Sequence, residues 1–191
     1  MTPRPVARFV GSALLWLPLA FAVWYFTAPI ILWPAKLIVE AIARFGLADI
    51  VRAVEQTGSV YTFATTLKPG QAAAATGNVT VDVNTLLYSF GLPLYAALVL
   101  AAREPRWPRT LLIGYVVIIP FVAWGVLADF LKTVAIAAGP MVASQTGFSA
   151  WQREVIAFAF QFGTLIMPTV VPAIVWVVMH RKMLERLRSP A

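Results

Sequence analysis

The sequence predicts an all-α polytopic membrane protein, a four-helix transmembrane bundle with a small antiparallel β cap and an amphipathic interfacial helix. Of its 191 residues, 60% are hydrophobic and only 12% are charged, whereas a soluble domain carries about 25% charged residues. About 20 apolar residues are enough to cross a bilayer, and four stretches of that length contain no ionisable side chain: residues 9–33, 83–102, 110–128 and 155–179. This composition argues against a soluble enzyme, a disordered chain and a nucleic-acid-binding domain.

The positions of the cationic residues predict how these spans are oriented. Nine of the fifteen Lys and Arg residues lie where an even number of spans puts them on one side of the membrane: Arg4, Arg8, Arg103, Arg106, Arg109, Arg181, Lys182, Arg186 and Arg188. By the positive-inside rule, both termini and the middle connector are cytoplasmic. Residues 34–84 carry four basic and four acidic side chains. The net charge of +7 therefore reports topology, and we expect the lipid bilayer, not nucleic acid, as the general partner.

Spans and charges together divide the chain into nine segments. The transmembrane helices are expected at residues 9–33, 85–102, 110–132 and 153–180. The cytoplasmic segments are residues 1–8, 103–109 and 181–191, and the periplasmic segments are residues 34–84 and 133–152. A fifth span within residues 133–152 would place the basic tail outside, so we expect a loop there, either plain or re-entrant.

The first periplasmic segment begins with an amphipathic helix. Lys36, Glu40 and Arg44 lie four residues apart on one face, and apolar residues recur at helical spacing on another: Leu37, Ile38, Ala41, Ile42 and Phe45. Three positions are open for this helix. It lies in the outer interface, prolongs the first span, or packs against the small outer domain.

Residues 50–84 have the period of β-strands. Two runs rich in β-branched and aromatic residues, 50–56 and 59–67, surround a turn, and Val79, Val81 and Val83 alternate with polar residues. This pattern predicts a three-stranded antiparallel sheet. Such a small sheet is marginal alone, so we expect the amphipathic helix or a partner protein to cover its apolar face.

The sequence offers few groups for chemistry. It has no cysteine and a single histidine, His180, which excludes a thiolate nucleophile and a three-histidine zinc site. No HExxH, GxxxxGK[ST] or GxSxG motif is present. We therefore predict no catalytic residue, no metal site and no cofactor, and we interpret His180 as an interfacial side chain beside lipid head groups.

Ionisable residues near the outer ends of the spans are the other polar feature. Four of them flank residues 133–152, and they either pair at the interface or form an outer-face polar cluster that contacts a substrate or partner: Asp129, Lys132, Arg153 and Glu154. Gln161 is the only strongly polar residue well inside a span. We expect it to form an interhelical hydrogen bond rather than an ion path.

Two stretches resemble a known family. VDVNTLLYSFGLPLYAALVLAARE and LLWLPLAFAVWYFTAPIILWPA are similar to the small exosortase H-associated membrane proteins of Gram-negative bacteria. The resemblance implies an inner-membrane protein that works beside exosortase H, a transpeptidase-like enzyme that processes C-terminal sorting tails, with the strands in the periplasm. It supplies no catalytic residues. Exosortases use Cys, Arg and His, so a chain without cysteine is not that enzyme.

The leading hypothesis is a non-enzymatic accessory protein that holds an exosortase H-type enzyme or its substrate at the periplasmic face. The candidate partner-binding residues are Tyr61, Phe63, Asp82, Asn84, Tyr88, Gly91 and Pro93. The aromatics would supply contact area, Asn84 would cap the strand–helix junction, and Gly91 and Pro93 would shape the helix, although each serves the fold equally well. The alternative is a small membrane transporter or lipid-handling protein, whose polar cavity between spans would join Gln161 to Asp129 or Glu154. The oligomeric state is left open.

Overall fold

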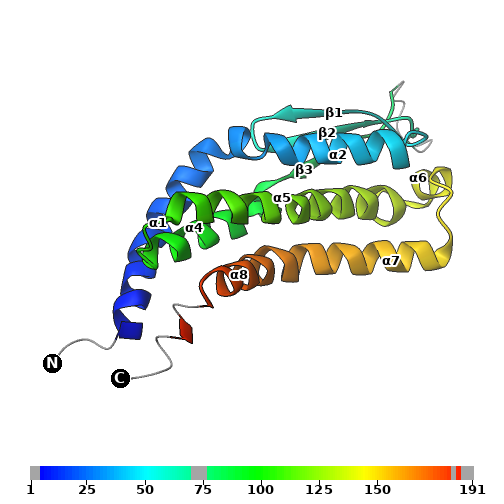
Figure 1. Ribbon diagram of the computed structural model, residues 1–191. Coiled ribbons are helices and arrows are strands. Elements are labelled where there is room, and N and C mark those ends of the chain that lie inside the picture. The colour runs from blue at the N-terminus through cyan, green and yellow to red at the C-terminus, as the bar shows by residue number, and fades with distance from the viewer. Residues whose placement is uncertain (1–4, 70–76, 182–183, 186–191) are drawn as a thin grey trace.

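The computed structural model describes residues 5–69, 77–181 and 184–185 (Figure 1). The predicted cytoplasmic residues 1–4, 182–183 and 186–191, and residues 70–76 of the predicted cap, lie outside this description. In chain order the elements are α1 (Pro5–Ile31), α2 (Trp33–Gly46), β1 (Val51–Thr57), β2 (Val60–Thr65), β3 (Thr80–Asn84), α3 (Leu86–Ser89), α4 (Gly91–Ala101), α5 (Trp107–Lys132), the π-helical turn η1 (Thr133–Ala137), α6 (Pro140–Gln145), α7 (Ala150–Gln161), the π-helical turn η2 (Phe162–Ile166) and α8 (Met167–Met179).

Three helical units are long and apolar enough to cross a membrane. They are Val6–Ile31, Trp107–Ala137 and Ala150–Met179, the last two continuing through η1 and η2. The fourth apolar helix, Leu86–Ala101, measures about 24 Å at 1.5 Å per residue, less than the roughly 30 Å hydrocarbon core of a bilayer. A mostly helical membrane protein is therefore confirmed, with three long apolar helices and a shorter one, whereas the prediction of four transmembrane helices is not confirmed.

A bend at Leu32 turns the chain from α1 into α2. Pro34 lies in the first turn of α2 and has no N–H to donate to the preceding turn, which interrupts the helical hydrogen bonds. Figure 1 shows α1 inclined to the other long helices, whereas α2 lies beside α5. Because α2 also contacts β1, the amphipathic helix takes the last of its three predicted positions, packed against the sheet.

Helix α2 buries a face of small side chains and leaves much of its predicted apolar face exposed. Its buried residues are the small or short side chains Ala35, Val39 and Ala43, which let neighbouring elements approach its axis closely. The large side chains Leu37, Ile42 and Phe45 of the predicted apolar face are exposed, Phe45 to 87%. Close approach of α2 to its neighbours α5 and β1 thus goes with small side chains, while the large apolar ones remain uncovered within the chain.

The predicted three-stranded antiparallel sheet is confirmed, with strand order β1-β2-β3. Residues alternate between its faces, and Tyr61, Phe63, Val81 and Val83 are buried on one of them. The Phe63 ring stacks on Phe130 of α5 with centroids 4.2 Å apart and planes 15° apart, and the Tyr61 hydroxyl donates to the Leu32 carbonyl oxygen. The apolar cover that the sheet needs thus comes from α2 and α5 of the same chain.

The strand β3 runs into α3 through a single residue, Thr85. Its backbone N–H and its hydroxyl both donate to the Ser59 carbonyl oxygen, at 3.0 and 2.7 Å. The β1–β2 hairpin is thereby tied to the start of the short apolar helix.

Residues 133–152 form less loop than predicted. Helix α5 continues through η1 to Ala137, α6 follows, and α7 begins at Ala150. The Asp129–Lys132 pair, which suggested the end of the span, is an i,i+3 ion pair of 3.3 Å within the helix, a spacing that helices accommodate. The turn after η1 comes at Gly139, whose φ of 92° favours glycine.

The stack of Phe63 on Phe130 is expected to hold the sheet on α5. A Phe63→Ala substitution should lower the free energy of unfolding by about 3–5 kcal/mol, because it removes a buried ring and leaves a cavity. Denaturant unfolding of the purified protein in detergent, followed by near-UV circular dichroism, measures this. The control is Thr80→Ala on the exposed side of β3, for which a change within about 0.5 kcal/mol is expected. Equal losses in the two variants would contradict the role given to the stack.

Candidate functional site

The aromatic candidates Tyr61, Phe63 and Tyr88 are buried within the chain, with at most 3% of each residue exposed. Burial raises the pKa of the Tyr61 hydroxyl, so this group stays protonated and donates to Leu32. Tyr88 fits against Gly125 of α5, where a methyl group would lie 2.4 Å from its ring. The contact area of these three rings is therefore already used inside the molecule.

Gly91 and Pro93 lie on α4 and face two different neighbours. A methyl group at Gly91 would lie 2.2 Å from the Pro168 carbonyl oxygen and 2.6 Å from the Pro172 ring, so glycine is needed for α4 to meet α8. Pro93 lines a groove on the side of α1. Both residues shape the packing of the shorter apolar helix.

Asp82 and Asn84 are the exposed members of the candidate set. The Asp82 carboxylate accepts a hydrogen bond of 2.7 Å from the Thr62 hydroxyl on the neighbouring strand. The Asn84 side-chain oxygen accepts a hydrogen bond of 3.1 Å from the Leu86 N–H. This bond crosses the strand–helix junction, where the sequence predicted that Asn84 caps the helix. These two side chains are open to a partner from the solvent side of the sheet.

The four outer ionisable residues form two groups rather than one cluster. Lys132 pairs with Asp129 and lies 4.3 Å above the Phe160 ring. Arg153 donates to the Ala143 carbonyl oxygen at 3.3 Å, and with Glu154 it lines a cavity of about 450 Å³ between η1, α6 and α7. The Tyr88 hydroxyl lies near Asp129, so the two sets of candidates meet there.

Gln161 is exposed at the end of α7. It therefore does not face Asp129 or Glu154 across a cavity, as the transporter hypothesis requires. Two grooves between the helices have apolar walls.

The first groove lies between α2, α5 and α7 and has a volume of about 490 Å³. We call it the α2–α5–α7 groove. Among its walls Ile42, Trp124 and Val155 are about half exposed. The full lining is Ile38, Ile42, Gly46, Leu47, Pro120, Trp124, Leu127, Ala128, Leu131, Val155, Ile156 and Ala159. The exposed Phe45 of α2 is adjacent in sequence to Gly46 of this lining. Its ring therefore adds apolar surface beside the groove.

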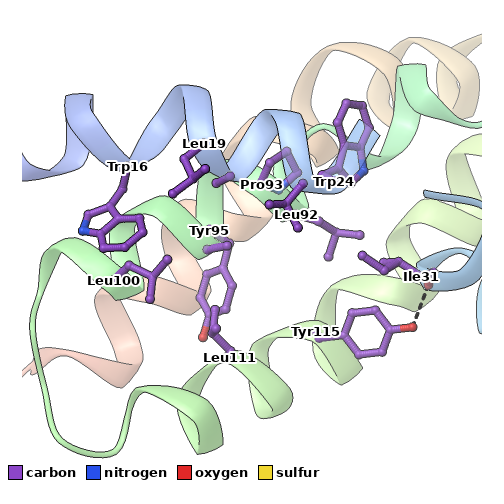
Figure 2. Close-up of a pocket in the computed structure, with 13 residues that line it drawn as sticks. Trp16, Leu19, Trp24, Ile31, Leu92, Pro93, Tyr95, Leu100, Leu111 and Tyr115 are labelled. Atoms are coloured by element: carbon purple, nitrogen blue, oxygen red, sulfur yellow. Dashed lines mark hydrogen bonds between the residues drawn. The ribbon is translucent and has the colours of Figure 1, made fainter. Parts of the chain in front are cut away.

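The second groove, the α1–α4–α5 groove, lies between the inclined α1 and α5, with α4 as its third wall (Figure 2). Its volume is about 350 Å³. Tyr95 donates to the Thr110 carbonyl oxygen and Tyr115 to the Ile31 carbonyl oxygen, each at 2.7 Å. The lining is Trp16, Leu19, Ala20, Val23, Trp24, Ile31, Leu92, Pro93, Tyr95, Ala96, Leu100, Leu111 and Tyr115.

His180 is buried, with 1% exposure, in place of the expected interfacial position. One ring nitrogen lies 2.9 Å from the Trp176 carbonyl oxygen, and the ring stacks on Trp176, which in turn stacks on Phe9 of α1. Aromatic neighbours and a backbone acceptor one turn earlier keep the imidazole inside. Trp176 and His180 lie one helical turn apart, but Phe9 lies near the other end of the chain, so the sequence did not indicate the full stack.

Ionisable groups elsewhere in the described residues are arranged for structure. On α2 the Lys36 ammonium lies 2.9 Å from the Glu40 carboxylate and holds the pKa of Glu40 below its usual value. No group of three or more His, Asp or Glu side chains within the described part of the chain is placed to hold a metal ion. What the molecule offers to ligands is mainly apolar surface.

Sequence reasoning missed the glycines that set the helix packing. Gly114 and Gly125 of α5 receive the rings of Tyr95 and Tyr88, whose atoms would lie 2.1 and 2.4 Å from an added methyl group. Small residues within apolar helices are typical of close helix contacts in membranes. This signal is present in the sequence, but it does not say which aromatic ring fills each position.

The close contact at Gly91 can be tested against a glycine with free space. Gly91→Ala should lower the free energy of unfolding by about 1–3 kcal/mol, because the new methyl group overlaps the Pro168 backbone. The matched control is Gly11→Ala in α1, where nothing lies within 4 Å and replacing a helical glycine is expected to stabilise by roughly 0.5–1 kcal/mol. Thermal unfolding in detergent measures both. A stabilised Gly91→Ala variant would show that α4 and α8 are not in close contact.

The comparisons with known proteins identify the family. The chain belongs to the exosortase H-associated membrane proteins, whose family model matches residues 3–183. No curated protein and no solved structure matches the chain significantly.

Proposed function

We propose that this member of the exosortase H-associated membrane proteins is a non-enzymatic accessory protein of the bacterial inner membrane. It assists exosortase H-type C-terminal protein sorting by holding the enzyme or its substrate at the periplasmic face. The family description supports association with exosortase H. The positive-inside rule supports an orientation with both termini cytoplasmic and the sheet in the periplasm.

The single observation that carries the holding role is the exposed apolar surface of the α2–α5–α7 groove. Helix α2 buries its small side chains and leaves Ile42 and Phe45 uncovered. Packing of a partner's apolar side chains into such a groove gains dispersion contacts. Since the groove is lined by α2, which contacts the sheet, and by two long helices, a membrane-bound enzyme would contact it through segments near the outer membrane surface.

The candidate residues divide between two tasks in this proposal. Asp82 and Asn84, exposed on the sheet, supply polar contacts to the partner. Tyr61, Phe63 and Tyr88 act indirectly, because they hold the sheet, α2 and α3 in place beside α5. Gly91 and Pro93 do the same for α4. The partner thus meets a rigid surface, which reduces the ordering cost of binding.

The proposal is tested by capture of a co-expressed exosortase H-type enzyme on the tagged, full-length chain in mild detergent. The double variant Ile42→Ala, Val155→Ala removes apolar area from the groove wall. We expect it to capture about thirtyfold less enzyme, since truncated contacts at an interface cost on the order of 1 kcal/mol each.

The matched control is Val10→Ala, Ile30→Ala, which removes the same residue types from exposed positions on α1 outside both grooves. This control should capture as much enzyme as the wild type. Equal capture by both double variants would refute the assignment to the groove. Absence of capture by the wild type, with unchanged tail processing in cells that lack the chain, would refute the accessory role itself.

A further inference from the structure

The α1–α4–α5 groove (Figure 2) has the place, walls and size of a site for one lipid acyl chain. Two of its three walls belong to helices long and apolar enough to cross a membrane, Val6–Ile31 and Trp107–Ala137. The groove therefore faces the hydrocarbon of the bilayer. Leu19 and Val23 at its edge are about half exposed, so the opening on the α1 side is accessible from the lipid.

The walls offer apolar contact and no free hydroxyl. The two hydroxyl groups among the lining side chains, those of Tyr95 and Tyr115, donate to backbone carbonyl oxygens of α5 and α1. Figure 2 shows the second of these bonds at the Ile31 end of the groove. The lining also includes Trp24, whose buried indole N–H has no hydrogen-bond partner among the described residues. A single N–H does not replace the hydrogen bonds that a polar ligand loses on leaving water, whereas a hydrocarbon chain loses none.

The dimensions of the groove suit an extended hydrocarbon chain. A methylene group is close in size to a water molecule, whose share of liquid volume is about 30 Å³, so the groove holds roughly a dozen methylene groups. The lining runs along α1 from Trp16 to Ile31, about 22 Å, which is enough for an extended chain.

The groove exists because the helices around it do not close on one another. Helix α1 is inclined to α5 (Figure 1), and the short α4 packs against both at one side of the opening. Left empty, the lining side chains would lose dispersion contacts. We propose that one acyl chain of a membrane phospholipid fills this groove as a bound lipid, joining α1 to α5. This inference stands independently of the accessory role.

The test is retention of dioleoylphosphatidylethanolamine by the full-length protein, counted by native mass spectrometry after purification from vesicles of that lipid. We expect one lipid per wild-type chain. Ala20→Trp places an indole in the groove and should lower retention about tenfold, the loss expected when about two methylene groups lose their contacts. The control Ala22→Trp adds the same ring at an exposed α1 position outside the lining and should retain the lipid.

A second measurement keeps the proposal testable if Ala20→Trp does not fold. The protein is placed in nanodiscs of a phosphatidylcholine with brominated acyl chains, which quench tryptophan fluorescence on contact. The fluorescence of Trp16 is obtained as the difference between the wild type and Trp16→Phe. This fluorescence should be quenched in the nanodiscs and should stay quenched after transfer to detergent. Equal retention by Ala20→Trp and Ala22→Trp, no retained lipid on the wild type, or loss of quenching on transfer to detergent would each overturn the assignment. Protection of Trp16 from quenching by a partner protein's helix would also overturn it.

Discussion

Phe63 stacks on Phe130 where the sheet meets α5, and the arrangement of the rest of the chain depends on this contact. A three-stranded sheet is only marginally stable by itself, so its buried face must be covered. Helices α2 and α5 supply the cover, and the Tyr61 hydrogen bond fixes the sheet to the bend at Leu32. The bend in turn directs α1 away from α5 and so opens the groove between them.

The helices are held by complementary shapes and by few polar bonds. Gly91, Gly114 and Gly125 leave space for the Pro168 backbone and the Pro172 ring and for the rings of Tyr95 and Tyr88. In lipid, where helix association gains little from the hydrophobic effect, such close packing is a main source of stability. The ion pairs within the described residues lie on α2, where Glu40 pairs with Lys36 and Arg44, and at the end of α5, where Lys132 pairs with Asp129.

Helix α2 buries its small side chains inside the protein, and several of its large apolar side chains are exposed. Those of Ile42 and Phe45 contribute area that a partner in or near the outer leaflet can cover, and this surface underlies the accessory role proposed for the chain. The α1–α4–α5 groove is smaller, about 350 Å³ against about 490 Å³, and its two lining hydroxyl groups donate to backbone carbonyl oxygens, which suits the lipid chain proposed for it. The two grooves are thus assigned different ligands, one protein and one lipid.

The sequence by itself determined the membrane class, the positions of the apolar helices and the three antiparallel strands. Hydropathy and the alternation of Val79, Val81 and Val83 are local properties that each segment carries alone. It also carried the family resemblance in its quoted stretches. Tertiary structure decided which face of α2 is buried, because its close contacts with α5 and the sheet cover Ala35, Val39 and Ala43 and leave larger neighbours exposed. It also placed Phe63 on Phe130 and Phe9 on Trp176, since contacts between residues far apart in the chain leave no periodic signal.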